Sequence, residues 1–390
     1  MRFIDLQTQF HELEGQIRKR IDQVLAHGQF IMGPEVGELE SRLAEHCGVS
    51  HCLACSSGTD ALYMCLLAFN TGPGDVIFTT PFTFMATAEV IALCGATPVF
   101  VDIDSQTFNI DPEKLRTACQ AVRTKDPDIH PLPRSLVQTD KAIAPKGIIA
   151  VDLFGQPADY EAINKLAASE GLFVIEDAAQ SFGASLKGRM SGSLADAGCT
   201  SFFPAKPLGG YGDGGAVLTE SGALARELRS IRVHGQGSSK YENRRLGING
   251  RLDTIQAAVL LSKLEAFPRE LERREQIAAE YAQGLKPLAS QVTAPRVAPD
   301  KRSAWAQYSI LAKKRDGLKA WLAEREVPSA VYYELPLHLQ PAFHWLGHGQ
   351  GDFPVTEAVS KRILSLPMHP YLTQEEIVLV IDSIQAFYAT

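Results

Sequence analysis

Residues 200–216 read Thr-Ser-Phe-Phe-Pro-Ala-Lys-Pro-Leu-Gly-Gly-Tyr-Gly-Asp-Gly-Gly-Ala, with one lysine set between an apolar stretch and a run of glycines. Lys206 stands between Pro204 and Pro207, and the glycines that follow allow other backbone to approach closely. A lysine held in such a turn can lose its hydration, which lowers the pKa of its amine and makes it a nucleophile for a carbonyl. A lone lysine is more often an ordinary surface residue, so the surrounding sequence must decide between these interpretations.

The composition and net charge indicate which classes of partner the protein can bind. Its 390 residues are 45% hydrophobic, which is typical of a globular protein of two domains or of one large and one small domain. The net charge is −7 and there is no block rich in lysine or arginine, so nucleic acid is not expected as a partner. No signal peptide and no membrane partner are expected, because residues 1–16 are polar and no apolar run is long enough.

The cysteines indicate a reducing compartment. They are odd in number, seven, and stand at Cys47, Cys52, Cys55, Cys65, Cys94, Cys119 and Cys199. Cys52 and Cys55 form a C-x-x-C pair, but no second pair follows at zinc spacing, and the residues between them suit a strand. We therefore predict buried free thiols, no metal site and a cytoplasmic protein.

Strands alternate with helices through the first half of the chain. Strands are predicted at 49–55, 75–79, 98–102, 147–151, 172–176 and 216–219, with helices at 61–69, 83–94, 111–121, 159–170 and 221–233. This alternation predicts right-handed crossovers and an α/β fold with a mostly parallel sheet. Such sheets bind ligands beyond the carboxyl ends of their strands, where the 56–59 turn, Phe84 and Asp177 fall.

Helices frame this core at both ends of the chain. They are predicted at 9–27 and 35–46, and again at 252–267 and 268–284, and residues 305–390 hold the short strands and helices of a separate α+β unit. We place the domain boundary near Phe267, which gives a large domain at 1–267 and a small C-terminal domain at 268–390. The polar, proline-containing stretch 122–146 is predicted to be a long surface excursion.

Residues 56–60, Ser-Ser-Gly-Thr-Asp, form a small-residue turn between a strand and a helix. Free N–H groups and the positive end of the helix dipole meet at such a turn, which favours a phosphate. Because Ser, Thr and Asp also favour plain helix caps, both interpretations stay open for the turn alone.

The glycine run contains a second pattern. Gly210, Gly212 and Gly215 satisfy G-x-G-x-x-G, but a dinucleotide fingerprint needs a strand before the glycines and a helix after them. A strand is predicted to follow at 216–219, so the match fails on its context and gives little support to a nicotinamide site. The glycines are better explained by close packing around Lys206.

Four chemical groups found in different parts of the sequence can be explained by a single cofactor. The helix start after residue 57 offers donors to a phosphate, Asp177 is a buried carboxylate, Phe84 is a flat neighbour and Lys206 is an amine. Pyridoxal phosphate needs all four, because its aldehyde forms a Schiff base with lysine and its ring nitrogen needs an anion to stay protonated. Gln180, three residues after Asp177, offers a second polar group.

The chain resembles the sugar aminotransferases of the DegT/DnrJ/EryC1/StrS family, which have the aspartate aminotransferase fold, fold type I. The resemblance covers nearly the whole chain. It rests on Gly33-Pro34 with Glu40 downstream, Ser57-Gly58-Thr59-Asp60-Ala61-Leu62, Pro81-Phe82-Thr83-Phe84, Glu176-Asp177-Ala178-Ala179-Gln180, Ser201-Phe202-Phe203-Pro204-Ala205-Lys206, Gly212-Asp213-Gly214-Gly215 and Pro336-Leu337-His338.

The resemblance assigns roles around pyridoxal 5′-phosphate. Lys206 would bind the cofactor covalently, Asp177 would pair with its ring nitrogen, and Gln180 would approach its ring oxygen. The remaining cofactor contacts would be Gly58, Thr59 and Ser201 at the phosphate and Phe84 on the ring. In this family a G-x-N-x-R segment of a partner subunit completes the phosphate site, so Gly247-Ile248-Asn249-Gly250-Arg251 implies a homodimer in which Asn249 reaches across.

The resemblance also indicates a substrate. Residues 247–253, with 156–159, are most similar to enzymes that aminate position 3 of a UDP-linked 2-acetamido-3-oxo-glucuronate. A uronate carboxylate needs a bidentate cation, for which Arg251 is the candidate, although Arg251 could instead pair with Asp253 or cap a helix. The other expected substrate contacts are Phe30, Met32, Tyr332, Tyr333 and His338. Glu334 would repel a uronate if it faced the site.

The implied reaction is a ping-pong transfer from glutamate, which leaves as 2-oxoglutarate, to the keto-sugar during biosynthesis of a surface polysaccharide such as a lipopolysaccharide O-antigen. Two rivals stay open. One is an aminotransferase for a 4-keto-6-deoxy nucleotide sugar on the same scaffold. The other is a non-catalytic regulatory protein that retains the fold, against which the complete set of Lys206, Asp177, Gln180 and Ser201 argues.

Overall fold

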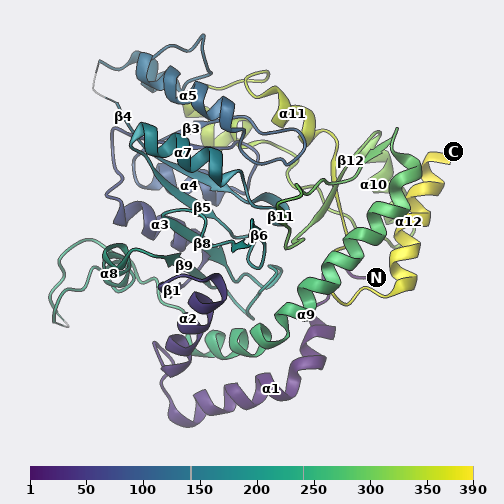
Figure 1. The fold of residues 1–390 in the computed structure, drawn as a ribbon, viewed down its shortest axis with the longest axis horizontal. Helices are drawn as coiled ribbons and strands as arrows, with labels where there is room; N and C mark the ends of the chain where they lie inside the picture. The colour runs from purple at the N-terminus through teal and green to yellow at the C-terminus, as the bar shows by residue number, and fades with distance from the viewer. Residues whose placement is uncertain (141–142, 240, 390) are drawn as a thin grey trace.

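The computed structural model describes residues 1–140, 143–239 and 241–389. These residues form one large sheet with the strand order β1-β9-β8-β5-β4-β2-β3 (Figure 1). The strands are β1 His51–Cys55, β2 Asp75–Thr79, β3 Thr97–Phe100, β4 Ala144–Val151, β5 Phe173–Asp177, β8 Ala197–Ser201 and β9 Gly215–Thr219. All run parallel except β9, which is antiparallel to both of its neighbours, so the mostly parallel sheet is confirmed.

Alternate residues of the central strands pack on opposite faces of this sheet. Val76 and Phe78 join a buried cluster that includes Leu115 of one set of helices. Ile77, between them, packs with Leu62 on the other face. Because side chains point up and down in turn along a strand, a strand that is apolar throughout needs helices on both faces.

The helices provide this double cover. The first face carries α5 Pro112–Thr124 and α7 Tyr160–Glu170, and the second carries α3 Gly58–Ala68, α4 Ala86–Leu93 and α8 Gly222–Ile231. Near the N-terminus lie α1 Leu6–His27 and α2 Pro34–Cys47, and both pack against the long helix α9 Thr254–Leu285. Among the described residues, no helix is long and apolar enough to cross a membrane.

The two helices predicted at 252–267 and 268–284 are one helix, α9, with Pro268 inside it. A proline removes one helical hydrogen bond, but apolar contacts on both sides hold this helix together. Phe267 and Leu271 pack in the cluster beside the sheet, whereas Ile277 and Tyr281 pack in the C-terminal cluster. In Figure 1, α9 runs from the sheet to the C-terminal elements. The domain boundary at Phe267 stays a prediction.

The C-terminal part holds the predicted short strands and helices. The strands β10 Val292–Thr293, β12 Tyr308–Ala312 and β13 Ile363–Leu366 form one antiparallel sheet, and the helices are α10 Arg315–Ala323, α11 Pro354–Ser360 and α12 Gln374–Ala389. A third small sheet joins β6 Ser185–Leu186, β7 Arg189–Met190 and β11 Lys301–Arg302. Between α10 and α11 the chain returns to the large sheet, where Leu337 and Phe343 pack against Phe100 of β3.

Residues 141 and 142 of the stretch 122–146 lie outside the described residues, and the rest is only in part the predicted surface excursion. Helix α5 continues to Thr124, α6 spans Arg134–Gln138, and β4 begins at Ala144. Leu132 and Leu136 are buried in the cluster under α5 and α7. His130 is buried as well, and its Nε2 lies 2.7 Å from the Phe100 carbonyl oxygen. The polar composition concealed these few buried side chains, which tie the stretch to the core.

Candidate active site

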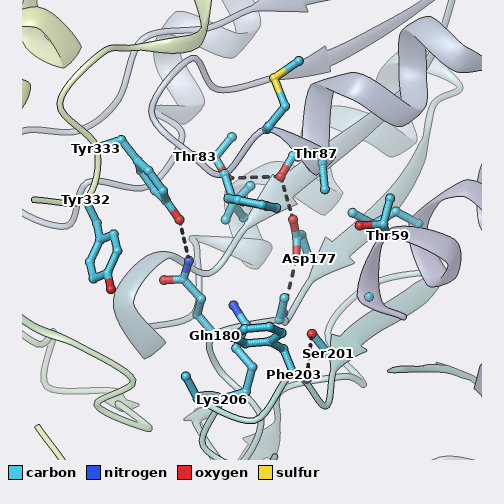
Figure 2. A pocket seen from close by; sticks show the side chains of 18 of the residues that line it. Thr59, Thr83, Thr87, Asp177, Gln180, Ser201, Phe203, Lys206, Tyr332 and Tyr333 are labelled. Atoms are coloured by element: carbon cyan, nitrogen blue, oxygen red, sulfur yellow. Dashed lines mark hydrogen bonds between the residues drawn. The ribbon is translucent and has the colours of Figure 1, made fainter. Parts of the chain in front are cut away.

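A cavity of about 1020 Å³ lies beyond the carboxyl ends of the parallel strands, as predicted for this class of sheet. The predicted residues that line it are Gly58, Thr59, Phe84, Asp177, Gln180, Ser201, Lys206, Tyr332 and Tyr333. Figure 2 shows Tyr332 and Tyr333 on one side and Thr59 and Ser201 on the other, with Asp177 between them. One cavity therefore collects side chains from segments more than a hundred residues apart.

Lys206 lies in the turn that joins β8 to β9. Its backbone N–H donates to the Phe203 carbonyl at 2.8 Å. The turn is wound so tightly that a Cβ on Gly209 would stand 2.4 Å from the Pro204 carbonyl oxygen, so only glycine fits there. The side chain extends toward Asp177 and Gln180 in Figure 2. Burial lowers the pKa of the Lys206 amine, and the Asp177 carboxylate acts in the opposite direction. A larger share of neutral amine follows.

Asp177 ends β5 and is almost completely buried. Its Oδ2 accepts a hydrogen bond from the Thr87 hydroxyl at 2.8 Å, and its Oδ1 accepts one from the Ala179 N–H at 3.3 Å. Burial raises the pKa of the Asp177 carboxyl, whereas these two hydrogen bonds and the charge of Lys206 lower it. The hydrogen bonds thus support the ionised form in a place that would otherwise favour the neutral acid.

Gln180 has an orientation fixed by its neighbours. Its Oε1 accepts from the Phe154 N–H at 2.7 Å, and its Nε2 donates to the Tyr333 hydroxyl at 3.2 Å. Because Gln180 donates to that oxygen, the proton of the Tyr333 hydroxyl is free to point elsewhere in the cavity. Burial raises the pKa of Tyr333, so this hydroxyl stays protonated and can act as a donor.

The phosphate end predicted at the start of α3 is a narrow cradle. Ser57 caps the helix by accepting from the Asp60 N–H at 3.0 Å, and Gly58 is the first helical residue. A Cβ on Gly58 would stand 2.7 Å from the Cβ of Ser201. The glycine therefore lets the helix start approach the Ser201 hydroxyl. The N–H groups of a first helical turn have no partner within the helix, so this cradle suits an anion.

The structure does not bring every predicted site residue to the cavity. Asn249 forms a β-bridge with Val233 and, like Arg251, is not part of the lining. Phe30 and Met32 are exposed hydrophobic residues of the loop before α2. His338 is fully buried outside the cavity, where its Nε2 lies 3.2 Å from Glu357 Oε1, although its neighbour Leu337 lines the cavity.

Several lining residues were missed by sequence reasoning. Thr87 holds Asp177, and the Thr83 hydroxyl lies 3.1 Å from that of Thr87. The predicted helix 83–94 would place residues four apart on one face, but α4 begins at Ala86, so Thr83 lies in the bend before it. Leu335 and Gln340 also line the cavity, but a leucine and a glutamine in a loop carry no recognisable pattern.

The arrangement fits pyridoxal phosphate. The glycine cradle and the Ser201 hydroxyl match its phosphate, the buried Asp177 matches its ring nitrogen, and the amine of Lys206 matches its aldehyde. These groups lie at the carboxyl ends of a mostly parallel sheet, and a smaller C-terminal unit follows. This combination defines a pyridoxal-phosphate-dependent transferase of fold type I.

Comparison with known proteins narrows this class. The chain belongs to the DegT/DnrJ/EryC1/StrS aminotransferase family, whose model matches residues 11–385. A crystal structure of an aminotransferase of this family from Brucella abortus is similar over 100% of both chains, with a TM-score of 0.93 and 47% identity. The fold class and the aminotransferase activity predicted from the sequence are confirmed. Aminotransferases of this family use pyridoxal phosphate, which confirms the cofactor.

Two curated relatives match over nearly the whole chain. The UDP-2-acetamido-2-deoxy-3-oxo-D-glucuronate aminotransferase of Pseudomonas aeruginosa is 45% identical over 97% of this chain and 98% of its own length. The pleiotropic regulatory protein of Geobacillus stearothermophilus is 42% identical over 99% of this chain and 98% of its own length. Names of both kinds, enzymatic and regulatory, thus occur among proteins similar to this chain.

Proposed function

We propose that the protein transfers the amino group of glutamate to carbon 3 of UDP-2-acetamido-2-deoxy-3-oxo-D-glucuronate. The carrying observation is the cavity itself, in which Lys206 and Asp177 lie at the base and Tyr332 and Tyr333 form a polar wall. Its volume of about 1020 Å³ is sufficient for a cofactor and the sugar part of a nucleotide sugar. The similarity to the Pseudomonas aeruginosa enzyme supports this sugar.

The chain's own residues supply the positions and the protons. Pyridoxal phosphate, when bound, supplies a conjugated ring that accepts an electron pair from the substrate carbon. Gly58, Thr59 and Ser201 would hold its phosphate, and Asp177, as a carboxylate, would hold the proton on its ring nitrogen. The hydrogen bonds from Thr87 and Ala179 favour the ionised form of that carboxylate and oppose the effect of its burial.

Lys206 moves the proton at the substrate carbon. Because burial lowers the pKa of its amine, a larger share of the amine is neutral and can accept that proton as general base. The same amine, once protonated, returns the proton as general acid. One lysine thus serves glutamate in the first half of the reaction and the keto-sugar in the second, which predicts ping-pong kinetics.

The proposal includes a homodimer with a shared active site. Phe30 and Met32 are exposed, and Asn249 and Arg251 lie outside the cavity of their own chain. These positions suit contacts with a second copy, in which Asn249 would complete the phosphate site and Arg251 would bind the uronate carboxylate. Mixing a Lys206→Ala protein with an Asn249→Asp protein should restore part of the activity that each lacks. Restoration would fail if each chain built a complete site alone.

We place this reaction in the cytoplasm, in the biosynthesis of a surface polysaccharide such as a lipopolysaccharide O-antigen. The seven cysteines are free, and all but Cys94 are buried, which suits a reducing compartment.

The deciding experiment follows the two half-reactions separately. Holoenzyme mixed with glutamate should release one equivalent of 2-oxoglutarate for each site. Addition of the 3-oxo-glucuronate nucleotide should then yield its 3-amino product. Release of 2-oxoglutarate without amination of this sugar would refute the substrate and favour the 4-keto-6-deoxy sugars as acceptors. A protein that binds the cofactor but releases no 2-oxoglutarate would instead be a regulatory member of the fold.

A further inference from the structure

The charges that line the cavity are mostly negative. Asp177, Asp213 and Glu334 contribute carboxylates, and Lys206 is the one cationic side chain of the described chain in the lining. Lys206 and Asp177 both belong to the reacting end. Away from that end, the charged side chains that line the cavity are the carboxylates of Asp213 and Glu334, so a bound sugar meets negative charge from this chain.

Glu334 occupies a particular place among them. It directly follows Tyr333, whose hydroxyl contacts Gln180 at the base of the cavity. Its side chain is exposed, and within the described residues it has no hydrogen bond and no ion pair. Asp213, in contrast, belongs to the glycine run after Lys206. Within the described residues of its own chain, Glu334 is thus an unpaired negative charge next to the wall formed by Tyr332 and Tyr333.

A sugar that reacts beside Lys206 shares the cavity with Tyr333 and Glu334, so substituents on its ring can face them. A carboxylate at carbon 6 carries the same charge as Glu334, and like charges in a partly enclosed cavity repel each other more than in bulk water. A hydroxymethyl group at carbon 6 carries no charge and can donate a hydrogen bond to the carboxylate. The same residue therefore acts in opposite directions on the two sugars.

We propose that Glu334 is a specificity-determining residue that disfavours a carboxylate at carbon 6 of the sugar relative to a hydroxymethyl group. This inference rests on the proposed function, because it assumes that a UDP-linked 2-acetamido sugar occupies the cavity. The uronate is then bound against the repulsion of Glu334, whatever attraction Arg251 of a second copy adds.

Binding of unreactive ligands tests this inference without the reaction. UDP-N-acetylglucosamine and its uronate, UDP-N-acetylglucosaminuronate, carry a hydroxyl instead of the 3-oxo group and cannot be aminated. Calorimetry on holoenzyme gives Kd for each. Glu334→Gln should lower the Kd of the uronate by about three- to fivefold at low salt, and by less at high salt. The Kd of UDP-N-acetylglucosamine should stay unchanged or rise slightly. Glu334→Lys should tighten the uronate further.

A matched control removes a carboxylate elsewhere. Glu324 is exposed at the end of α10, outside the cavity, so Glu324→Gln should leave the ratio of the two Kd values unchanged. An unchanged ratio in Glu334→Gln, or an equal change in Glu324→Gln, would overturn the inference. So would a lack of measurable binding of either ligand to every variant.

The outcomes separate the two proposals. The Kd ratio could change in Glu334→Gln although the protein aminates neither 3-oxo sugar. That result would support the role of Glu334 and refute the proposed reaction. Amination of both sugars with an unchanged ratio would refute the role of Glu334 and retain the reaction.

Discussion

The two ends of the cavity are built differently. At the base, Asp177 and Gln180 are buried at 5% exposure each, and both oxygens of Asp177 and the oxygen of Gln180 accept hydrogen bonds. At the rim, Leu335 is 41% exposed, and Glu334 beside it is exposed as well. The base is attached to strand ends, whereas much of the rim comes from loops.

This difference separates the chemistry from the choice of substrate. A buried hydrogen-bonded group cannot change without leaving a polar partner unsatisfied, which costs about 1–3 kcal/mol. An exposed rim side chain can change with little effect on folding. We therefore expect substitutions at the base to abolish the reaction or shift its pH dependence, and substitutions at the rim to alter mainly KM for the sugar.

The largest expected effect is that of Lys206→Ala. Loss of the proton-transferring amine should lower kcat by at least about a thousandfold in both half-reactions, as assayed by release of 2-oxoglutarate. Lys206→Arg keeps the positive charge but cannot become a neutral base near neutral pH, and should be equally inactive. Circular dichroism should show both variants folded. Turnover within tenfold of the wild type in either variant would contradict the assignment of Lys206.

Thr87→Val should change the pH dependence of the reaction. The Thr87 hydroxyl donates to Asp177 and thereby lowers the pKa of that carboxyl, which burial raises. Without it the pKa rises, so protonation begins at a higher pH and the acid limb of kcat/KM moves upward. A hydrogen bond to a charged group corresponds to a shift of about one pH unit.

Thr83→Val provides the graded control for this prediction. Its hydroxyl lies 3.1 Å from that of Thr87 and is thus one step further from the carboxylate. The shift of the acid limb should have the same sign and be smaller. A downward shift in Thr87→Val, or a larger shift in Thr83→Val, would show that this pair of hydroxyls does not support the ionised form.

The same division explains what the sequence could predict. Lys206 and Asp177 could be found because one stands in a glycine-rich turn and the other at the end of an apolar strand. The fold followed from the alternation of apolar strands and helices. Strand β8 was missed, because its residues Ala-Gly-Cys-Thr-Ser have weak strand propensity and are set in place by their neighbours β5 and β9.

Other parts of the site depend on contacts that no local pattern carries. Phe154 adopts a φ of 60°, which is uncommon for a bulky residue, and its N–H fixes the amide of Gln180. His338 stands in a motif expected at the substrate, yet its ring packs 4.8 Å from that of Phe353 and bonds to Glu357, away from the cavity. Tertiary packing decided both positions.

Tyr333→Phe should have a moderate effect, because Tyr333 lies between base and rim. The variant loses the acceptor of the Gln180 Nε2 hydrogen bond and the free donor in the cavity. We expect kcat/KM for the sugar to fall by about three- to tenfold. Within the described residues Tyr332 makes no hydrogen bond to Gln180, so Tyr332→Phe should change kcat/KM less. Equal losses in the two variants would mean that the contact with Gln180 does not matter.

Leu335→Ala should have the smallest effect and is the sharpest test of the division between the two ends. Leu335 lines the cavity but is already 41% exposed, so its truncation removes little apolar contact with a bound sugar. KM for the sugar should rise by no more than about threefold, while release of 2-oxoglutarate from glutamate stays unchanged. The glutamate half-reaction serves as the internal control, because it uses the same base and a much smaller substrate. A tenfold loss in that half-reaction would show that the rim positions the base, and the two ends would then have to be treated as one unit.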